Sequence, residues 1–213
     1  MSLFYRMSRG LVRCLLRLLG PTTVIGHDRI PESGGVIIAC NHVSLLDPPL
    51  VGCSVRRECA FMARHDLWKF RPFGALISRL NAFPVRRNTA DRGAIKEAIR
   101  RLDEGQVLVL FPEGTRSHDG RLQPAEPGLT MILQRSKAPV IPCALVGPEK
   151  MLPHGRRIPN PTRLKVVFGK PYYPSAQATR EEVLFAVMDS IARLLIEHRP
   201  ELPPGHGYRL DGA

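Results

Sequence analysis

The chain has 213 residues, a length that fits one domain with a full hydrophobic core, or one domain and a small appendage, and argues against several domains. Hydrophobic residues make up 44% and charged residues 23%, as in an ordinary globular protein, but 31 Lys and Arg against 19 Asp and Glu leave a net charge of +12. This excess favours a polyanionic partner and does not choose among nucleic acid, an anionic membrane and a phosphorylated substrate.

Cysteine spacing and hydropathy exclude several further classes. The cysteine count is odd and no Cys-x-x-Cys occurs, so we expect reduced core thiols, a cytosolic setting and no metal site. No uncharged apolar stretch approaches the ~20 residues that span a bilayer. The apolar run near the N-terminus is interrupted by Arg13 and Arg17 and lacks a small-residue cleavage site, which is atypical of a signal peptide.

Residues 2–19 predict an amphipathic helix. At about 100° per residue, Arg6, Arg9, Arg13 and Arg17 fall within an arc of roughly 80°, and no acid interrupts this basic face. The opposite side is apolar and consists of Leu3, Phe4, Met7, Leu11, Leu15, Leu18 and Leu19. This pattern is typical of a helix lying in a membrane interface, and it predicts peripheral or monotopic attachment at the cytoplasmic face. A helix that packs on its own domain and leaves its basic face in solvent would show the same pattern.

Beyond Gly20-Pro21, apolar runs typical of buried strands alternate with helical patterns. Strands are expected at residues 36–40, 58–62, 82–85, 106–111, 140–146 and 164–168. Helices are expected at residues 73–80, from Thr89 or Asp91 to Glu104, at 129–135, and from a Thr179-x-x-Glu182 capping box to about Glu197.

This alternation predicts an α/β fold with a mixed, mostly parallel central sheet flanked by helices and preceded by the N-terminal amphipathic helix. We divide the chain into that helix at residues 1–20, a folded domain at 21–198 and a flexible tail at 199–213. The tail is inferred from its Pro and Gly content.

His42 directly follows a predicted buried strand, and Asp47 lies five residues further on. On one regular helix the two would be about 140° apart, so they meet only if His42 lies in the loop and Asp47 begins the next helix. Pro48-Pro49 favours this arrangement. Asp47 would then orient the imidazole and leave its other nitrogen as a base. Alternatively, Asp47 only caps the helix and His42 is an ordinary loop residue.

A second polar group, Glu113-Gly114-Thr115-Arg116, follows the predicted strand at 106–111, and Pro112 with Gly114 predicts a turn there. A guanidinium at that place can hold a phosphate through two hydrogen bonds. Alternatively, the segment is a charged turn with an internal Glu–Arg pair. Arg86-Arg87 follows a third predicted strand and is either a solvated surface pair or part of the same anion site.

Four segments in order resemble the glycerolipid acyltransferases, in particular the 1-acylglycerol-3-phosphate acyltransferase family, over roughly residues 20–175. These segments are Asn41-His42-x4-Asp47, Phe83-Pro84-Val85-Arg86, Phe111-Pro112-Glu113-Gly114-Thr115-Arg116 and Val140-Ile141-Pro142. The chain departs from the family pattern at two places. Pro84-Val85 replaces the Ile-Asp that is common in the second block, and Glu126-Pro127-Gly128 lacks a basic residue often found before that glycine.

The resemblance implies that residues 21–198 are an acyltransferase domain that makes phosphatidic acid. His42 would act as general base on the acceptor hydroxyl, which attacks the thioester of acyl-coenzyme A or acyl-carrier protein, and Asp47 would orient His42. No acyl-enzyme and no cofactor beyond the acyl donor are expected. The acceptor site would comprise Arg86, Glu113, Gly114, Thr115 and Arg116, with the arginines on the glycerol phosphate and Arg87 as a further candidate.

Two alternatives stay open at this point. The same chemistry could use another acceptor, namely glycerol 3-phosphate, another lysophospholipid or a lyso-aminolipid. The chain could instead be a non-catalytic protein that binds anionic lipid or nucleic acid, as the charge of +12 suggests. Against nucleic acid as a partner, no recognised binding motif occurs, and only four Tyr and one Trp are available for stacking on bases.

Overall fold

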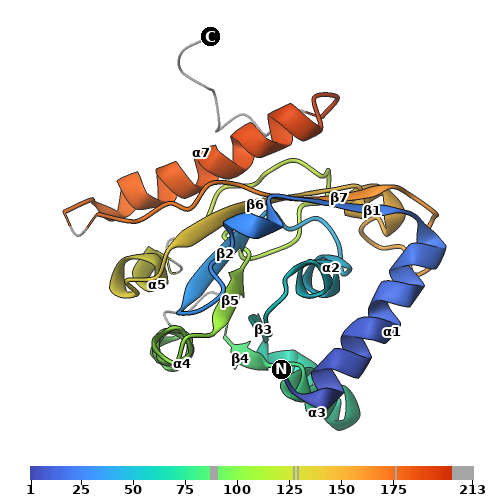
Figure 1. Cartoon of the computed structure of the whole chain (residues 1–213), viewed down its shortest axis with the longest axis horizontal. Helices are drawn as coiled ribbons and strands as arrows, with labels where there is room; N and C mark the ends of the chain where they lie inside the picture. Colours follow the sequence, from blue (N-terminus) through green and yellow to red (C-terminus); the bar gives the residue numbers. More distant parts are fainter. Residues whose placement is uncertain (87–90, 127, 129, 176, 203–213) are drawn as a thin grey trace.

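A computed structural model of the chain describes residues 1–86, 91–126, 128, 130–175 and 177–202 (Figure 1). Within these residues the structure is one sheet covered by helices on both faces. Arg87 and Thr89, which the sequence analysis singled out, lie outside the described residues, as do residues 203–213 of the expected tail.

Seven strands of the described residues form one sheet in the order β1-β7-β6-β2-β5-β3-β4. They are β1 (Thr22–Ile25), β2 (Val36–Cys40), β3 (Cys59–Arg64), β4 (Ala82–Val85), β5 (Val107–Leu110), β6 (Val140–Val146) and β7 (Leu164–Phe168). Five neighbouring pairs are parallel, and β6 with β7 is antiparallel. The predicted mixed, mostly parallel sheet is therefore confirmed.

The helices divide between the two faces of the sheet (Figure 1). Their bounds are α1 (Leu3–Leu19), α2 (Asp47–Ser54), α3 (Arg71–Arg79), α4 (Arg92–Asp103), α5 (Thr130–Arg135), α6 (Pro148–Met151) and α7 (Arg180–His198), with 3-10 turns η1 (His27–Arg29) and η2 (His65–Lys69). Side chains of α4, α5 and α7 belong to one apolar cluster, whereas those of α1, α2 and α6 belong to the other.

The central strands are buried on both faces because successive side chains of a strand point in opposite directions. In β2, Ile37 and Ala39 belong to the cluster under α4, α5 and α7, whereas Val36, Ile38 and Cys40 belong to the other cluster. All five residues are fully buried. A continuous apolar run is therefore what this central position requires, and it is the pattern that predicted the strand.

Two helix starts follow from side-chain caps. The carboxylate of Asp91 accepts a hydrogen bond from the backbone N–H of Ala94 at 3.0 Å, so α4 begins after Asp91. At α7 the predicted capping box is present, because Thr179 and Glu182 each accept from the other's backbone N–H.

The sequence analysis missed β1, the edge strand beside β7. Its four residues are mostly half-buried and form no continuous apolar run, so no strand signal stands out. The strand nevertheless matters, since its first residue lies beside Leu164 at the start of β7 and so fixes where α1 ends.

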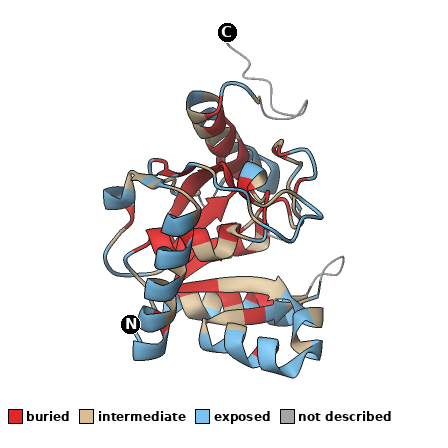
Figure 2. Cartoon of the chain, turned by 90° about the vertical axis from the view of Figure 1, so that its right-hand side faces the viewer, coloured by how far each residue is buried: buried red, intermediate tan, exposed pale blue. Residues whose placement is uncertain are grey.

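Helix α1 contacts the domain through a narrow strip, and most of its apolar arc is not part of that contact. Tyr5 and Leu16 are buried, and Arg13 donates a hydrogen bond to the carbonyl oxygen of Cys53 at the end of α2. The leucine face is exposed instead, with Leu11 at 64% and Leu18 at 76%. Figure 2 accordingly shows the helix next to the N label as pale blue over most of its length. This geometry does not fit a helix that buries its apolar face on its own domain.

No helix of the described residues combines the length and the apolar character needed to cross a membrane. Helix α1 has 17 residues and carries arginines along one flank.

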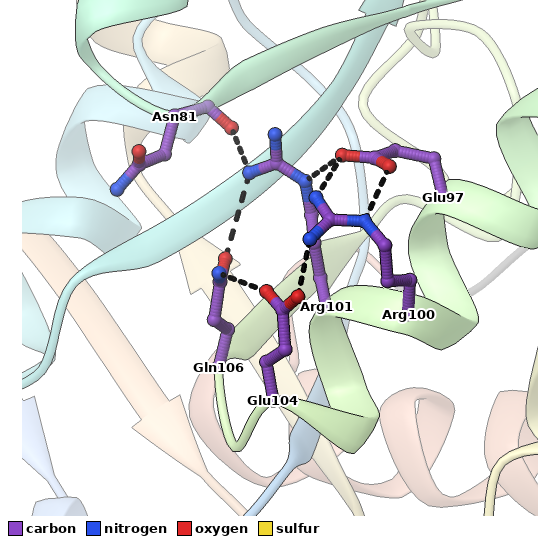
Figure 3. Close-up of polar contacts among 6 residues, drawn as sticks. All are labelled: Asn81, Glu97, Arg100, Arg101, Glu104 and Gln106. Carbon is purple, nitrogen blue, oxygen red and sulfur yellow. Dashed lines mark hydrogen bonds and ion pairs between the residues drawn. The ribbon is translucent and has the colours of Figure 1, made fainter.

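A network of charged side chains lies at the amino-terminal edge of the sheet, where β4 and β5 begin (Figure 3). Glu97 of α4 accepts hydrogen bonds from Arg100 and Arg101, and Arg100 also pairs with Glu104. Arg101 donates to the carbonyl of Asn81 at 3.3 Å, and its guanidinium lies 4.8 Å from the centre of the Phe83 ring. The network connects the end of α4 with the start of β4.

The expected tail begins later than the sequence analysis placed it. Arg199 is fully buried, its backbone N–H donates to Leu195, and its guanidinium lies 3.6 Å from the carboxylate of Glu149 in α6. Lys150 pairs with Glu201 at 3.2 Å. Residues 199–202 are therefore attached to the domain, because a buried arginine needs the charge that α6 provides.

Candidate active site

The candidate site lies where β2 and β5 end. In the parallel pair, Ala39 lies beside Leu110, so three residues further on His42 comes beside Glu113. The carboxyl ends of parallel strands are the usual place for ligands in open α/β sheets. The two polar segments that the sequence singled out are thus brought together by strand order.

His42 and Asp47 are in direct contact. His42 Nδ1 lies 2.8 Å from Asp47 Oδ2, with His42 in the loop after β2 and Asp47 as the first residue of α2. The predicted arrangement of loop and helix start is therefore present. The residue at the N-cap of α2 is Leu46, so Asp47 is not the cap of this helix. Because the carboxylate accepts at Nδ1, the lone pair of the imidazole is left at Nε2.

The carboxylate of Asp47 also holds the loop that carries His42. Its Oδ2 accepts backbone N–H groups of Val43 at 2.6 Å and Ser44 at 2.7 Å. The side chain is fully buried, and Oδ1 has no hydrogen-bond partner among the described residues. One oxygen therefore fixes both the imidazole and the backbone next to it.

The ring of His42 is further restrained by packing and by its own backbone. It stacks on Phe111 with ring centres 4.2 Å apart, and 12% of its side chain is exposed. The backbone N–H of His42 donates to Glu113 Oε1 at 2.6 Å, and the backbone carbonyl of His42 accepts from the N–H of Ser117 at 2.8 Å. The segment after β5 thus determines where the imidazole lies.

Glu113, which the sequence analysis assigned to the acceptor site, is buried. It is 2% exposed, and its two oxygens accept the backbone N–H groups of His42 and Gln123. Burial raises the pKa of this carboxyl to about 8, against the opposing effect of the two N–H donors. The burial places Glu113 beneath His42, where it supports the loop.

The turn predicted after β5 is present. Gly114 has φ of +65°, its N–H donates to the carbonyl of Phe111 at 3.0 Å, and a Cβ there would collide with the side chain of Glu126. Thr115 is exposed and Arg116 is half-buried beyond the turn.

Arg86 lies at the carboxyl end of β4, which is the same edge of the sheet. Its side chain is exposed, and its backbone N–H donates to Asp91 at 2.9 Å. Among the predicted acceptor residues, Arg116 precedes Ser117, whose N–H donates to the carbonyl of His42. Arg86 follows β4, which is three strands away from β2 in the sheet, because β5 and β3 lie between them.

Comparison with known proteins decides the family. Residues 21–146, more than half of the chain, match the family model described as Acyltransferase. The chain belongs to the acyltransferase family. A relative named 1-acyl-sn-glycerol-3-phosphate acyltransferase from Bacillus subtilis is 27% identical over 196 residues, 91% of this chain and 96% of that protein. A protein of the same name from Cocos nucifera is 28% identical over 89% of this chain and 61% of its own length.

A solved structure supports the same assignment. The 1-acyl-sn-glycerophosphate (LPA) acyltransferase PlsC from Thermotoga maritima superposes with a TM-score of 0.82 and 28% sequence identity. The superposition covers 92% of this chain and 79% of the other. The family, the α/β fold and the class of enzyme that the sequence analysis predicted are therefore confirmed.

Asn41 is a residue of the acyltransferase site to which the sequence analysis gave no role. Its side chain is fully buried and forms two hydrogen bonds with the backbone of Leu145 in β6, accepting at 2.7 Å and donating at 3.1 Å. These bonds extend the pairing of β2 and β6 by one residue. Ser44 similarly donates to the carbonyl of Leu152 at 2.9 Å. The only available signal was the position of Asn41 directly before His42.

The candidate site holds the imidazole of His42 in one orientation. Among the described residues, no group of three or more His, Cys, Asp or Glu side chains is arranged to hold a metal ion. What the site offers is an imidazole fixed at Nδ1, with Nε2 left for a reacting proton.

Proposed function

We propose that this acyltransferase moves a fatty acyl group from acyl-coenzyme A or acyl-carrier protein to the free hydroxyl of 1-acylglycerol 3-phosphate, giving phosphatidic acid and the free thiol. The observation that carries the proposal is the 2.8 Å contact of His42 Nδ1 with the buried carboxylate of Asp47 at the carboxyl edge of the sheet. The names of the relatives from Bacillus subtilis and Thermotoga maritima support the choice of acceptor.

In the proposed reaction, Nε2 of His42 removes the proton of the acceptor hydroxyl while the hydroxyl oxygen attacks the carbonyl carbon of the thioester. The tetrahedral intermediate then expels the thiolate, which takes the proton back from the imidazolium. Asp47 stabilises the imidazolium and keeps Nδ1 protonated. General base catalysis of this kind accounts for about 10²- to 10⁴-fold in rate.

We assign the acceptor phosphate to Arg116, with Arg86 and Arg87 as further candidates. Arg116 is half-buried and precedes Ser117, whose backbone N–H donates to the carbonyl of His42. The side chain of Arg116 therefore begins close to the proposed base. A guanidinium holds phosphate through two hydrogen bonds, which an ammonium group cannot reproduce. Thr115, exposed in the same turn, lies where a hydroxyl group could add a further contact.

We place the reaction at a membrane surface, reached through α1. Its apolar residues are exposed, and arginines lie along one flank. An amphipathic helix of this kind is stable in the interface of an anionic membrane. Peripheral attachment would let the enzyme take a single-chain lipid from the bilayer and return a two-chain lipid to it.

The test is acyl transfer by the purified full-length protein in liposomes, with lysophosphatidate and either acyl donor. We expect phosphatidic acid from the wild type and almost none from His42→Ala. His198→Ala is the matched control, because His198 is 18% exposed and lies at the end of α7. Glycerol 3-phosphate and a lyso-aminolipid are offered in parallel. Product from one of these instead of lysophosphatidate would overturn the acceptor, and full activity of His42→Ala would overturn the base.

The assignment of Arg116 has its own kinetic signature. If its guanidinium holds the acceptor phosphate, Arg116→Lys should raise the KM for lysophosphatidate about tenfold or more and leave the KM for the acyl donor nearly unchanged. An equal rise of both constants would contradict the assignment.

A further inference from the structure

A second apolar surface lies outside α1, on the segment between β3 and β4. Four large side chains of η2 and α3 are exposed there, Leu67 at 37%, Phe70 at 68%, Phe73 at 41% and Leu76 at 43%. We call these four residues the η2–α3 ridge. Lys69, Arg71 and Arg79 are exposed between and beside them. Side chains of this size usually find a partner, so the ridge needs an explanation.

The ridge is continuous with the leucine face of α1. The guanidinium of Arg79, in the last turn of α3, lies 5.7 Å from the centre of the Phe4 ring of α1. With about 100° per residue, Phe4 falls within the exposed apolar arc of α1, and Arg79 falls next to Leu76 on α3. The two apolar surfaces therefore meet along this contact. Figure 1 shows the two helices side by side near the N-terminus.

Both elements extend to the edge of the sheet that carries His42. The 3-10 turn η2 begins directly after β3, which is parallel to β5, so Leu67 and Phe70 follow a carboxyl end. Helix α1 ends just before β1, whose first residue lies beside the start of β7, and β7 is antiparallel to β6. Leu18, at the end of α1, is consequently at the same edge. An object that covers both surfaces would also lie next to the active site.

The charges around this surface indicate what covers it. A hollow on the other flank of α1 is lined by Arg6, Arg9, Arg13 and Arg56, together with Met1 and Gly10. None of the described residues that line it is acidic. An apolar surface bordered by guanidinium groups matches a bilayer with anionic head groups, whereas the same surface of a second copy would bring arginines against arginines.

We propose that the η2–α3 ridge and α1 together form one docking surface for an anionic lipid bilayer, with Phe70 and Phe73 inserted beside the leucines of α1. Two contacts far apart in the sequence then fix the orientation of the domain, which a single helix could not do. This proposal rests on the proposed function in one respect: docking would bring the edge of the sheet that carries His42 to the membrane.

The test is binding of the full-length protein to vesicles by co-sedimentation. The probes are vesicles of phosphatidylcholine with 30% phosphatidylglycerol and vesicles of phosphatidylcholine alone. We expect strong partitioning to the anionic vesicles, about tenfold weaker for Phe70→Ser and weaker again for Phe70→Ser with Phe73→Ser. Phe70 is the N-cap residue of α3, where serine is favourable, so the variant is expected to fold.

Phe185→Ser is the matched control, because Phe185 is 59% exposed on α7 and belongs to neither surface. It should bind vesicles like the wild type. Equal binding of Phe70→Ser and wild type would overturn the ridge as a docking element. A wild-type dimer in light scattering that Phe70→Ser converts to a monomer would overturn the bilayer as the occupant.

A kinetic readout separates this proposal from the proposed function. On a short-chain lysophosphatidate that is monomeric in water, Phe70→Ser should keep the wild-type kcat, whereas on anionic vesicles its rate should decrease in parallel with binding. If the wild type transfers no acyl group to either acceptor, the result counts against the proposed function. Vesicle binding alone then decides whether the η2–α3 ridge is a docking element. A decrease of kcat on the monomeric acceptor would overturn docking as the role of Phe70.

Discussion

The two edges of the sheet use the same residue types in opposite ways. At the amino-terminal edge, Glu97 is held by the guanidinium groups of Arg100 and Arg101 and is partly exposed (Figure 3). At the carboxyl edge, Asp47 and Glu113 are buried and are held mainly by backbone N–H groups. The pKa of Glu97 is lowered to about 2 by its arginines, whereas burial raises that of Glu113 to about 8.

The difference separates a contact that stabilises the fold from one that positions the proposed base, His42. A solvated carboxylate between two guanidinium groups has its charge balanced and its hydrogen bonds formed. A buried carboxyl group held by N–H donors is costly to the fold, but it fixes the backbone of His42 without a guanidinium group hydrogen-bonded to it. At the carboxyl edge we have proposed that Arg116 binds the acceptor phosphate instead of pairing with a carboxylate.

The largest expected effect is on turnover. Asp47→Asn keeps the shape of the side chain but removes the charge that holds Nδ1–H and stabilises the imidazolium. We expect kcat to decrease about 10³- to 10⁴-fold with little change in the KM for the acceptor. Glu97→Gln, the matched change at the other edge, should leave kcat unchanged. Steady-state kinetics tests this prediction, and similar decreases of kcat in the two variants would contradict the difference between the two edges.

The next effect is on stability. Arg199 is fully buried beside Glu149, whose side chain is 11% exposed, so Arg199→Met leaves a largely buried carboxylate without its counter-charge. We expect the free energy of unfolding to decrease by about 3–5 kcal/mol in urea titration. Arg193→Met removes an exposed pair with Asp189 on α7 and should cost less than about 1 kcal/mol. Equal losses would show that burial does not distinguish the two pairs.

The third effect is the most specific, because the two glutamates should give opposite slopes of stability against pH. The pKa of Glu113 is about 8 in the fold and ordinarily 4.5, so its contribution is most favourable below pH 4.5 and is lost as pH rises towards 8. The pKa of Glu97 is about 2, so its contribution is present above pH 4.5 and is lost as pH falls towards 2.

Unfolding measured across pH for wild type, Glu113→Gln and Glu97→Gln isolates each slope by difference. Glu113→Gln should flatten the decline between pH 4.5 and 8, and Glu97→Gln the decline below pH 4.5. Two difference curves of the same sign would contradict the account of the two edges.

The local features of this chain could be predicted from its sequence, because they depend on neighbouring residues. The apolar run of β2, the capping box at Thr179 and the start of α2 at Asp47 are all set within a few positions. The contact of His42 with Asp47 follows from the same local turn.

The long-range part could not be predicted because it depends on strand order. Glu113 reaches the backbone of His42 across 71 positions, and Asn41 reaches Leu145 across 104. Both contacts exist because β2 lies between β5 and β6, which no local pattern encodes. The burial of Arg199 could not be predicted from its neighbours in the sequence either, because its partner Glu149 comes from another element.

The most direct test of the central claim is a double-mutant cycle on kcat with His42→Ala, Asp47→Asn and the double variant, using lysophosphatidate in liposomes. If the two residues act as one unit, the double variant should lose about as much activity as His42→Ala alone. Losses that add, so that the double variant is slower by the product of the two single effects, would show that Asp47 does not act through His42.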